Sequence, residues 1–122
     1  MAHRVLDLLE AHPEYYERMN ATAAQLADGI RRVFSRRGLP FSVRQLESIV
    51  DFKFRPGITR NYDDACAADK ATFAQYYHAM RERGILLPPS QNEVMFISTA
   101  HSRDDIDETI QAIDDSLIAI GF

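Results

Sequence analysis

Apolar side chains recur every three or four residues in three long stretches of the chain, the spacing that places them on one face of a helix. Pro13 suits the first position of the first of these helices, and Gly38 suits its end. The other two cover residues 69–84 and 102–120, and each begins at a residue that can cap a helix. The pattern therefore predicts three long helices, each with one buried face.

Shorter stretches between these helices have the pattern of β-strands. Residues 41–44 and 50–55 alternate apolar and polar side chains, so each predicts a half-buried strand. In the second of them the alternation places Lys53 on the polar outer face. Residues 85–87 and 94–97 are short apolar runs, which we interpret as two further strands, the last of them buried.

Two short segments complete the predicted order of elements. Residues 5–9 resemble the last turns of a helix, and residues 58–65 form a loop or a short helix. Because the strands are few and are mixed with helices, we expect an α+β fold. It would be a two-layer sandwich, with helices packed on one face of a small, mostly antiparallel sheet of three to four strands. We expect residues 1–122 to form a single domain.

Composition narrows the class of protein. Of the 122 residues, 46% are hydrophobic, which is enough for a core and argues against disorder. The net charge of -4 argues against a nucleic-acid surface, which needs a basic patch. The single cysteine, Cys66, forms neither an internal disulfide nor a cysteine zinc cluster. The sequence has no signal peptide or bilayer-length apolar run, so we expect a cytoplasmic protein that binds neither nucleic acid nor membrane.

Few side chains suggest catalysis. The glycines form no phosphate-binding loop, and metal-ligand spacing is absent from the histidines, which are His3, His12, His78 and His101. For His101 we favour a structural role, bonded to nearby backbone, over a place in a cleft. Lys53 and Lys70 are the only lysines, and both lie on predicted polar faces. Neither is therefore suited to form a Schiff base.

Two further groups have both a structural and a functional interpretation. Arginines crowd the end of the first long helix, at positions Arg31, Arg32, Arg36 and Arg37. Cations there complement the helix dipole, and we favour that interpretation over an anion site. Tyr76 and Tyr77 could stack on a ligand, but their helical spacing favours packing in the core.

One loop stands apart from the rest of the chain. Pro88 and Pro89 have a fixed φ and no backbone N–H, so they stiffen it. A polar tip of Ser90, Gln91 and Asn92 then leads to Glu93. A stiff loop can present side chains at a fixed place. Glu93 is either an exposed loop carboxylate with a local hydrogen bond or a functional carboxylate, and spacing alone leaves both open.

Two motifs near this loop carry a resemblance to a known family. Residues 84–93 end in Pro-Pro-Ser-Gln-x-Glu, and residues 98–102 contain an Ala-His pair. Further matches lie at residues 52–55 and 61–65, so the resemblance covers nearly the whole chain, in order. Together these residues resemble the C-terminal part of glutamate-1-semialdehyde aminomutases and related class III aminotransferases. Those enzymes are of fold type I and depend on pyridoxal phosphate (PLP).

The resemblance implies a small α+β domain that packs on a large PLP-binding domain and closes one side of the active site. It implies that Glu93 faces substrate and cofactor, with Ser90, Gln91 and Asn92 beside it. It also implies that this chain contains no catalytic or cofactor-binding residue, because the PLP lysine and the phosphate-binding residues belong to the large domain. We therefore expect PLP in the full enzyme and none bound to this chain alone. The expected partners are the large domain and further copies in a homo-oligomer.

The sequence departs from the family pattern at two positions. Asn92 stands where an aromatic residue is usual, which implies a more polar or differently shaped substrate pocket. Glu47 stands where a glycine is common before the second strand. Without the large domain, we expect the chain to be a small domain expressed by itself, a proteolytic remnant or a separately encoded piece. The alternative is a free-standing interaction or dimerisation domain that kept the fold and lost the chemistry.

Overall fold

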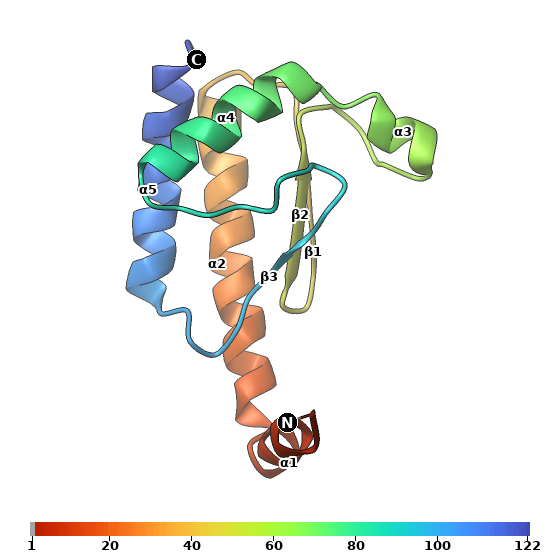
Figure 1. Cartoon of the computed structure of the whole chain (residues 1–122), viewed down its shortest axis with the longest axis vertical. Coiled ribbons are helices and arrows are strands. Elements are labelled where there is room, and N and C mark those ends of the chain that lie inside the picture. The colour runs from red at the N-terminus through yellow and green to blue at the C-terminus, as the bar shows by residue number, and fades with distance from the viewer. Residues whose placement is uncertain (1) are drawn as a thin grey trace.

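A computed structural model of the chain describes residues 2–122. Its elements follow one another from the N-terminus to the C-terminus as shown in Figure 1. They are α1 (Ala2–Ala11), α2 (Glu14–Arg36), β1 (Ser42–Leu46), β2 (Ile49–Lys53), α3 (Tyr62–Cys66), α4 (Lys70–Glu82), β3 (Met95–Phe96) and α5 (Arg103–Ala119). The three predicted long helices are confirmed as α2, α4 and α5. The segment predicted as a loop or a short helix contains α3.

The sheet has three strands in the order β1-β2-β3, and both pairs are antiparallel. Leu46 pairs with Ile49, so the tight turn between β1 and β2 consists of Glu47 and Ser48. Glu47 has a φ of 52°, a left-handed conformation that glycine adopts more readily. Beyond β3, the backbone N–H of Ile97 donates to the Ser48 carbonyl at 2.9 Å and extends the pairing.

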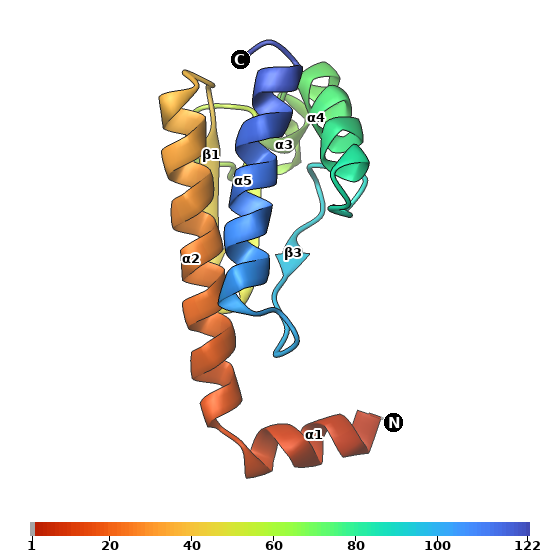
Figure 2. The same cartoon turned by 90° about the vertical axis from the view of Figure 1, so that its left-hand side faces the viewer.

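Helices α2, α4 and α5 lie on one face of this sheet, as predicted, whereas α3 lies beyond its other side (Figure 1). Helix α2 packs against β1 and β2, α5 packs along α2, and α4 packs against α5. Figure 2 shows α2 and α5 side by side, with the sheet behind them. Helix α1 turns away at the foot of α2, and none of its residues is buried. The α+β fold is therefore confirmed, with α1 outside the packed layers.

Aromatic rings fill the space between the helices and the sheet. Phe34 of α2 is fully buried at the centre. Its ring centroid lies 5.3 to 6.3 Å from those of Phe41, Phe52, Phe54 and Tyr76. Stacked and edge-on pairs at this spacing are favourable beyond the area they bury. Tyr76 is a core residue, as its helical spacing predicted.

The helix caps also match the sequence. The Asp69 carboxylate accepts a hydrogen bond from the Thr72 backbone N–H at 3.0 Å at the start of α4. At the start of α5, Ser102 and Asp105 form a reciprocal capping box. No helix within residues 2–122 has both the length and the apolar character needed to cross a bilayer.

The prediction that Lys53 points outward into solvent was wrong. Its side chain is 6% exposed and forms an ion pair with Asp51. The segment after β2 folds back over this end of the outer face, where Arg44 donates to the Thr59 carbonyl at 2.8 Å. Alternation along a strand shows which face a side chain lies on, but not whether a later segment covers that face.

The predicted strand at residues 85–87 was also wrong. The Ile85 backbone N–H donates to the Met80 carbonyl at 3.0 Å, so this segment closes the end of α4 and does not pair with a strand. Leu87 is buried, whereas Leu86 is 80% exposed. The strand predicted at residues 94–97 exists, but only Met95 and Phe96 have strand geometry. It was predicted to be buried, which was wrong for Phe96, because its side chain lies on the uncovered outer face and is 69% exposed.

Candidate functional site

The loop between α4 and β3 is held in place by the side chain of Gln91. Gln91 is buried, with only 7% of its surface exposed. Its Oε1 accepts a hydrogen bond from the Phe54 backbone N–H at 2.8 Å. Its Nε2 donates to the Asp69 carbonyl at 3.0 Å. One amide therefore ties the loop both to the end of β2 and to the cap of α4.

A compact turn follows the two prolines. The Ser90 hydroxyl accepts a hydrogen bond from the Asn92 backbone N–H at 3.1 Å, and the Ser90 carbonyl accepts one from the Glu93 N–H at 3.2 Å. These bonds fix the backbone on both sides of Gln91. The stiff loop predicted from Pro88 and Pro89 is thus reinforced by hydrogen bonds that the proline pattern alone does not reveal.

Glu93 lies at the end of this turn with an exposed side chain. Within residues 2–122 its carboxylate has no hydrogen-bond or ion-pair partner; only its backbone N–H is bonded. A carboxylate on a fixed backbone, free of internal partners, is available to a group outside the domain. The predicted local bond of the Glu93 side chain, which would have made it a structural cap, is absent from this part of the chain.

The other side of the loop borders a cavity of about 390 Å³ against α4. Ser90, Gln91 and Asn92 line it from the loop, and Phe73 and Tyr77 line it from the helix. Glu93 does not line this cavity. The same loop therefore presents the unpaired Glu93 carboxylate to solvent and lines the cavity with Ser90, Gln91 and Asn92.

A second cavity of about 390 Å³ forms an apolar groove beneath the loop. Its lining includes Leu86, Pro88, Val94, Phe96 and His101. Leu86 and Phe96 are 80% and 69% exposed, so apolar surface faces outward here. His101 accepts a hydrogen bond at Nδ1 from the Ser98 backbone N–H at 3.0 Å, which confirms the predicted structural bond.

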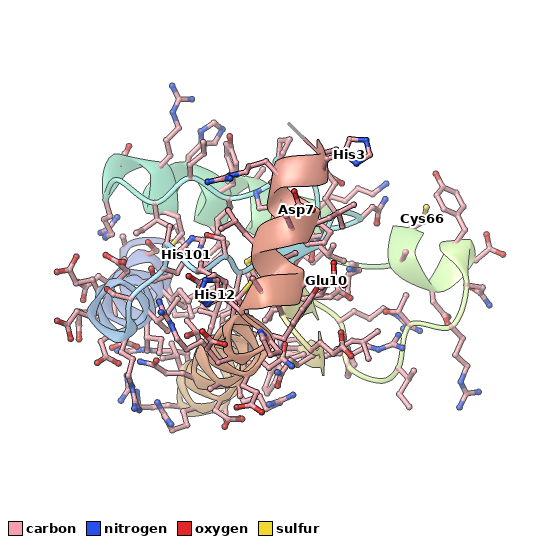
Figure 3. All side chains as sticks on the ribbon, turned by 90° about the horizontal axis from the view of Figure 1, so that it is seen from below. His3, Asp7, Glu10, His12, Cys66 and His101 are labelled. Carbon is pink, nitrogen blue, oxygen red and sulfur yellow. The ribbon has the colours of Figure 1, made fainter. Side chains whose placement is uncertain are left out.

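The ionisable residues do not form a metal site within residues 2–122. Lys53 is buried against Asp51, and Lys70 is exposed at the start of α4. No group of three or more potential metal ligands comes together in the part of the chain described. Figure 3 shows Cys66 on α3, well separated from His3, His12 and His101.

The arginines at the end of α2 take part in ion pairs rather than an open anion site. Arg37 donates to both carboxylate oxygens of Asp114 on α5, at 2.7 and 2.8 Å, and Arg36 adds a contact at 2.8 Å. The Arg37 guanidinium, together with Arg36, lowers the pKa of Asp114 to about 2. Sequence reasoning assigned these arginines to the helix dipole and missed their partner, which lies on a distant segment.

Comparison with known proteins supports the resemblance seen in the sequence. No family model matches the chain. Among curated proteins, it is 39% identical over 113 residues to glutamate-1-semialdehyde 2,1-aminomutase 1 of Staphylococcus aureus strain JH9. This match covers 93% of the chain and 26% of that protein. The chain thus spans about a quarter of the length of the curated relatives it matches.

Solved structures of the same class have the same fold. A glutamate-1-semialdehyde aminomutase from Pseudomonas aeruginosa PAO1, in complex with PMP, superposes with a TM-score of 0.77 and 25% identity over 85% of this chain and 23% of that chain. An omega-transaminase from Thermomicrobium roseum, 23% identical, gives a TM-score of 0.68 over 99% of this chain and 26% of its own. The chain is homologous over most of its length to one region, about a quarter, of the glutamate-1-semialdehyde aminomutases.

Proposed function

We propose that this domain closes the substrate side of the active site in a larger PLP-dependent enzyme that transfers an amino group on an amino or oxo acid. The proposal rests on the homology and on the share of each relative that the chain spans, about a quarter. By itself the domain is inactive in this proposal, because the groups that bind PLP belong to the rest of the enzyme. It acts in the cytoplasm, where the free thiol of Cys66 stays reduced.

The observation that carries the proposal is the state of Glu93. The loop that bears it is fixed by the two hydrogen bonds of Gln91, while its own carboxylate is exposed and unpaired within residues 2–122. A positioned carboxylate can orient a substrate amino group through a charge-assisted hydrogen bond. A group held this way costs little reorganisation when the substrate binds.

The neighbours of Glu93 have different parts in the proposal. Ser90 and Asn92 lie beside it in the same turn, and Asn92 is exposed. Gln91, predicted to face the substrate with them, has both amide atoms bonded inside the domain. In the proposal Gln91 therefore contributes by holding the loop, and Glu93 contributes the charge.

The lysines of the chain do not fit PLP. A Schiff base needs an accessible amine that is activated by its surroundings. The Lys53 amine is buried in an ion pair with Asp51, and Lys70 is solvent-exposed. Lys53 was predicted to be unsuitable because it is exposed; it is unsuitable because it is buried and paired. The proposal accordingly assigns the cofactor to the large domain.

Complementation tests the proposal. The S. aureus aminomutase without its matching C-terminal quarter would be mixed with this chain, and turnover of its own substrate would be measured. The control is the excised S. aureus C-terminal fragment added in the same way. We expect both fragments to bind the truncated enzyme and to restore turnover. If the control restores turnover and this chain neither binds nor restores it, the proposal fails.

The alternative, a free-standing interaction domain, is favoured by one observation. Helix α1 buries none of its residues, and Val5 and Leu6 on it are 50% and 62% exposed. Apolar surface of this kind marks an interface. Binding to the truncated enzyme without any restored turnover would favour this alternative over the role in catalysis.

A further inference from the structure

The cavity between α4 and the loop has the features of a separate ligand site. Its volume, about 390 Å³, lies within the range of small-molecule pockets. Lys70, Phe73, Tyr77 and His78 occupy successive turns along one face of α4 and line it from that side. Glu93 is not part of its lining, so this cavity lies beside the carboxylate proposed above and shares with that site only the turn of Ser90, Gln91 and Asn92.

The cavity favours a negative charge. Its lining includes the basic residues Lys70 and His78 and no aspartate or glutamate; Asp69, next to Lys70 in the chain, lies outside the lining and is bonded to Thr72. The chain as a whole has 18 acidic and 14 basic residues, so a cavity free of carboxylates differs from the general surface. A cation without a neighbouring carboxylate attracts an anion and gives it a charge-assisted hydrogen bond.

The polar groups of this helix face are available to a ligand. The side chains of α4 and its cap that form hydrogen bonds are Asp69, Thr72 and Arg83. The side chains of Lys70, Tyr77 and His78 have no such partner within residues 2–122. A ligand could therefore bond to them without breaking an existing contact.

The floor of the cavity suits a flat apolar body. The Phe73 and Tyr77 rings lie 6.3 Å apart between centroids and are tilted by 37°. Pro89 and Ala74 add further apolar surface to the lining. Aromatic faces bind flat rings by stacking and by removing apolar area from water.

The wall opposite α4 is already in place. It is the turn containing Ser90 and Asn92, which Gln91 fixes through its two hydrogen bonds to backbone groups. A preformed wall reduces the ordering cost of binding. We propose that this cavity binds a small organic anion with a flat apolar body, such as an aromatic carboxylate, with Lys70 as the main charge partner.

Benzoate is a suitable probe, and benzamide is its neutral counterpart. Amide resonances of the isotope-labelled chain would be followed by NMR as each compound is added. We expect benzoate to shift the resonances of residues on α4 and the loop around the cavity, and to bind at least about fivefold more tightly than benzamide. Lys70→Ala should weaken benzoate binding at least about fivefold.

The control is Arg81→Ala, which removes the same charge from an exposed position on α4 outside the cavity. It should change benzoate affinity less than about twofold, because surface charges are screened. Lys70 is exposed, so its replacement should leave the amide spectrum of the fold intact. Equal effects of the two variants, equal binding of benzamide, or shifts located elsewhere would each overturn the proposal. None of these outcomes depends on whether the domain serves an aminotransferase.

Discussion

A single buried amide determines where the loop between α4 and β3 lies. Gln91 gives the Phe54 N–H its acceptor and adds a second donor to the Asp69 carbonyl, which also accepts from the Phe73 N–H at 3.2 Å. Composition and spacing place Gln91 in a polar loop tip, and nothing in the local pattern shows that it points inward. Its partners lie 37 and 22 residues away along the chain, so only the tertiary structure reveals the role.

Replacing Gln91 with leucine should therefore destabilise the domain. Gln91→Leu keeps the volume and removes both hydrogen bonds. The Phe54 N–H is then left without a partner, while the Asp69 carbonyl keeps its bond from the Phe73 N–H. We expect the free energy of unfolding to fall by about 1–3 kcal/mol in urea titrations. Gln75→Leu, the same change at an exposed position on α4, should stay within about 0.5 kcal/mol. If Gln91→Leu lowered the free energy of unfolding by less than about 0.5 kcal/mol, the loop would be held by other contacts.

Glu47 is a second residue whose conformation matters more than its side-chain contacts. It has a φ of 52° in the tight turn between β1 and β2. The family that the sequence resembles commonly has a glycine at this position. Glu47→Gly should raise the free energy of unfolding by about 0.5–1 kcal/mol, because glycine adopts this conformation without the strain of a Cβ atom. Glu47→Ala keeps the Cβ atom and should give no gain. Equal stability of both variants in thermal melts would argue against strain at this turn.

At the scale of elements, the pattern of apolar residues is sufficient for the helices and insufficient for the sheet. The stripes and caps predicted α2, α4 and α5, since each is determined by residues close together in the chain. The segment at 85–87 was predicted as a strand because a short apolar run is ambiguous between a strand and a buried loop. Lys53 was placed on an open face because alternation along a strand does not show that its side chain is buried and paired with Asp51.

The packing of α2 against α5 includes a charged contact that should depend on pH. Asp114 is 13% exposed at its side chain and accepts two hydrogen bonds from Arg37 and a contact from Arg36. These arginines lower the pKa of Asp114 from 3.8 to about 2. A carboxylate whose pKa is lower in the folded state than in the unfolded state stabilises the fold at pH values above its unfolded-state pKa. This stabilisation is lost as the pH falls through its folded-state pKa.

We therefore expect Asp114→Asn to cost about 2 kcal/mol of unfolding free energy near pH 7. The difference between the original chain and the variant should shrink between about pH 4 and pH 2, as Asp114 becomes protonated. Urea titrations across this pH range would measure it. Asp115→Asn, at an exposed neighbouring position, should change stability by less than about 0.5 kcal/mol. A cost of Asp114→Asn that is the same at both ends of the range would exclude an electrostatic origin.

At the scale of the whole molecule, the domain has apolar side chains on its surface as well as in its core. Leu46, Ile49 and Phe96 stand in one row across the outer face of the three strands, and Leu46 and Phe96 are 72% and 69% exposed. Helix α1 adds Val5 and Leu6. Large exposed apolar patches mark surfaces that another molecule covers. The row across the sheet depends on strand register, so it becomes visible only in the structure.

Without a larger partner, this surface should cause self-association. We expect the average sedimentation coefficient of the isolated chain to rise as its concentration increases toward about millimolar. Phe96→Ser should reduce the rise, because it removes an exposed ring near the centre of the apolar surface. Ile58→Ser, which removes an exposed apolar side chain outside the row and the groove, serves as the control. A strict monomer throughout this range would contradict the prediction.

The central claim concerns Glu93, and one substitution tests it most directly. Glu93→Gln removes the charge and keeps the shape of a side chain that is exposed and unpaired within residues 2–122. In the isolated domain it should change the free energy of unfolding by less than about 0.5 kcal/mol. Glu82→Gln makes the same change at an exposed position on α4 and is the matched control.

The decisive measurement is turnover by a hybrid enzyme in which residues 1–122 replace the matching region of the S. aureus aminomutase. There Glu93→Gln should slow turnover by roughly 10- to 1000-fold, the range expected when one positioned polar group is lost, and Glu82→Gln should not. Normal turnover in the Glu93→Gln hybrid, together with a loss of more than about 1 kcal/mol in the isolated domain, would make Glu93 a structural residue and contradict the account.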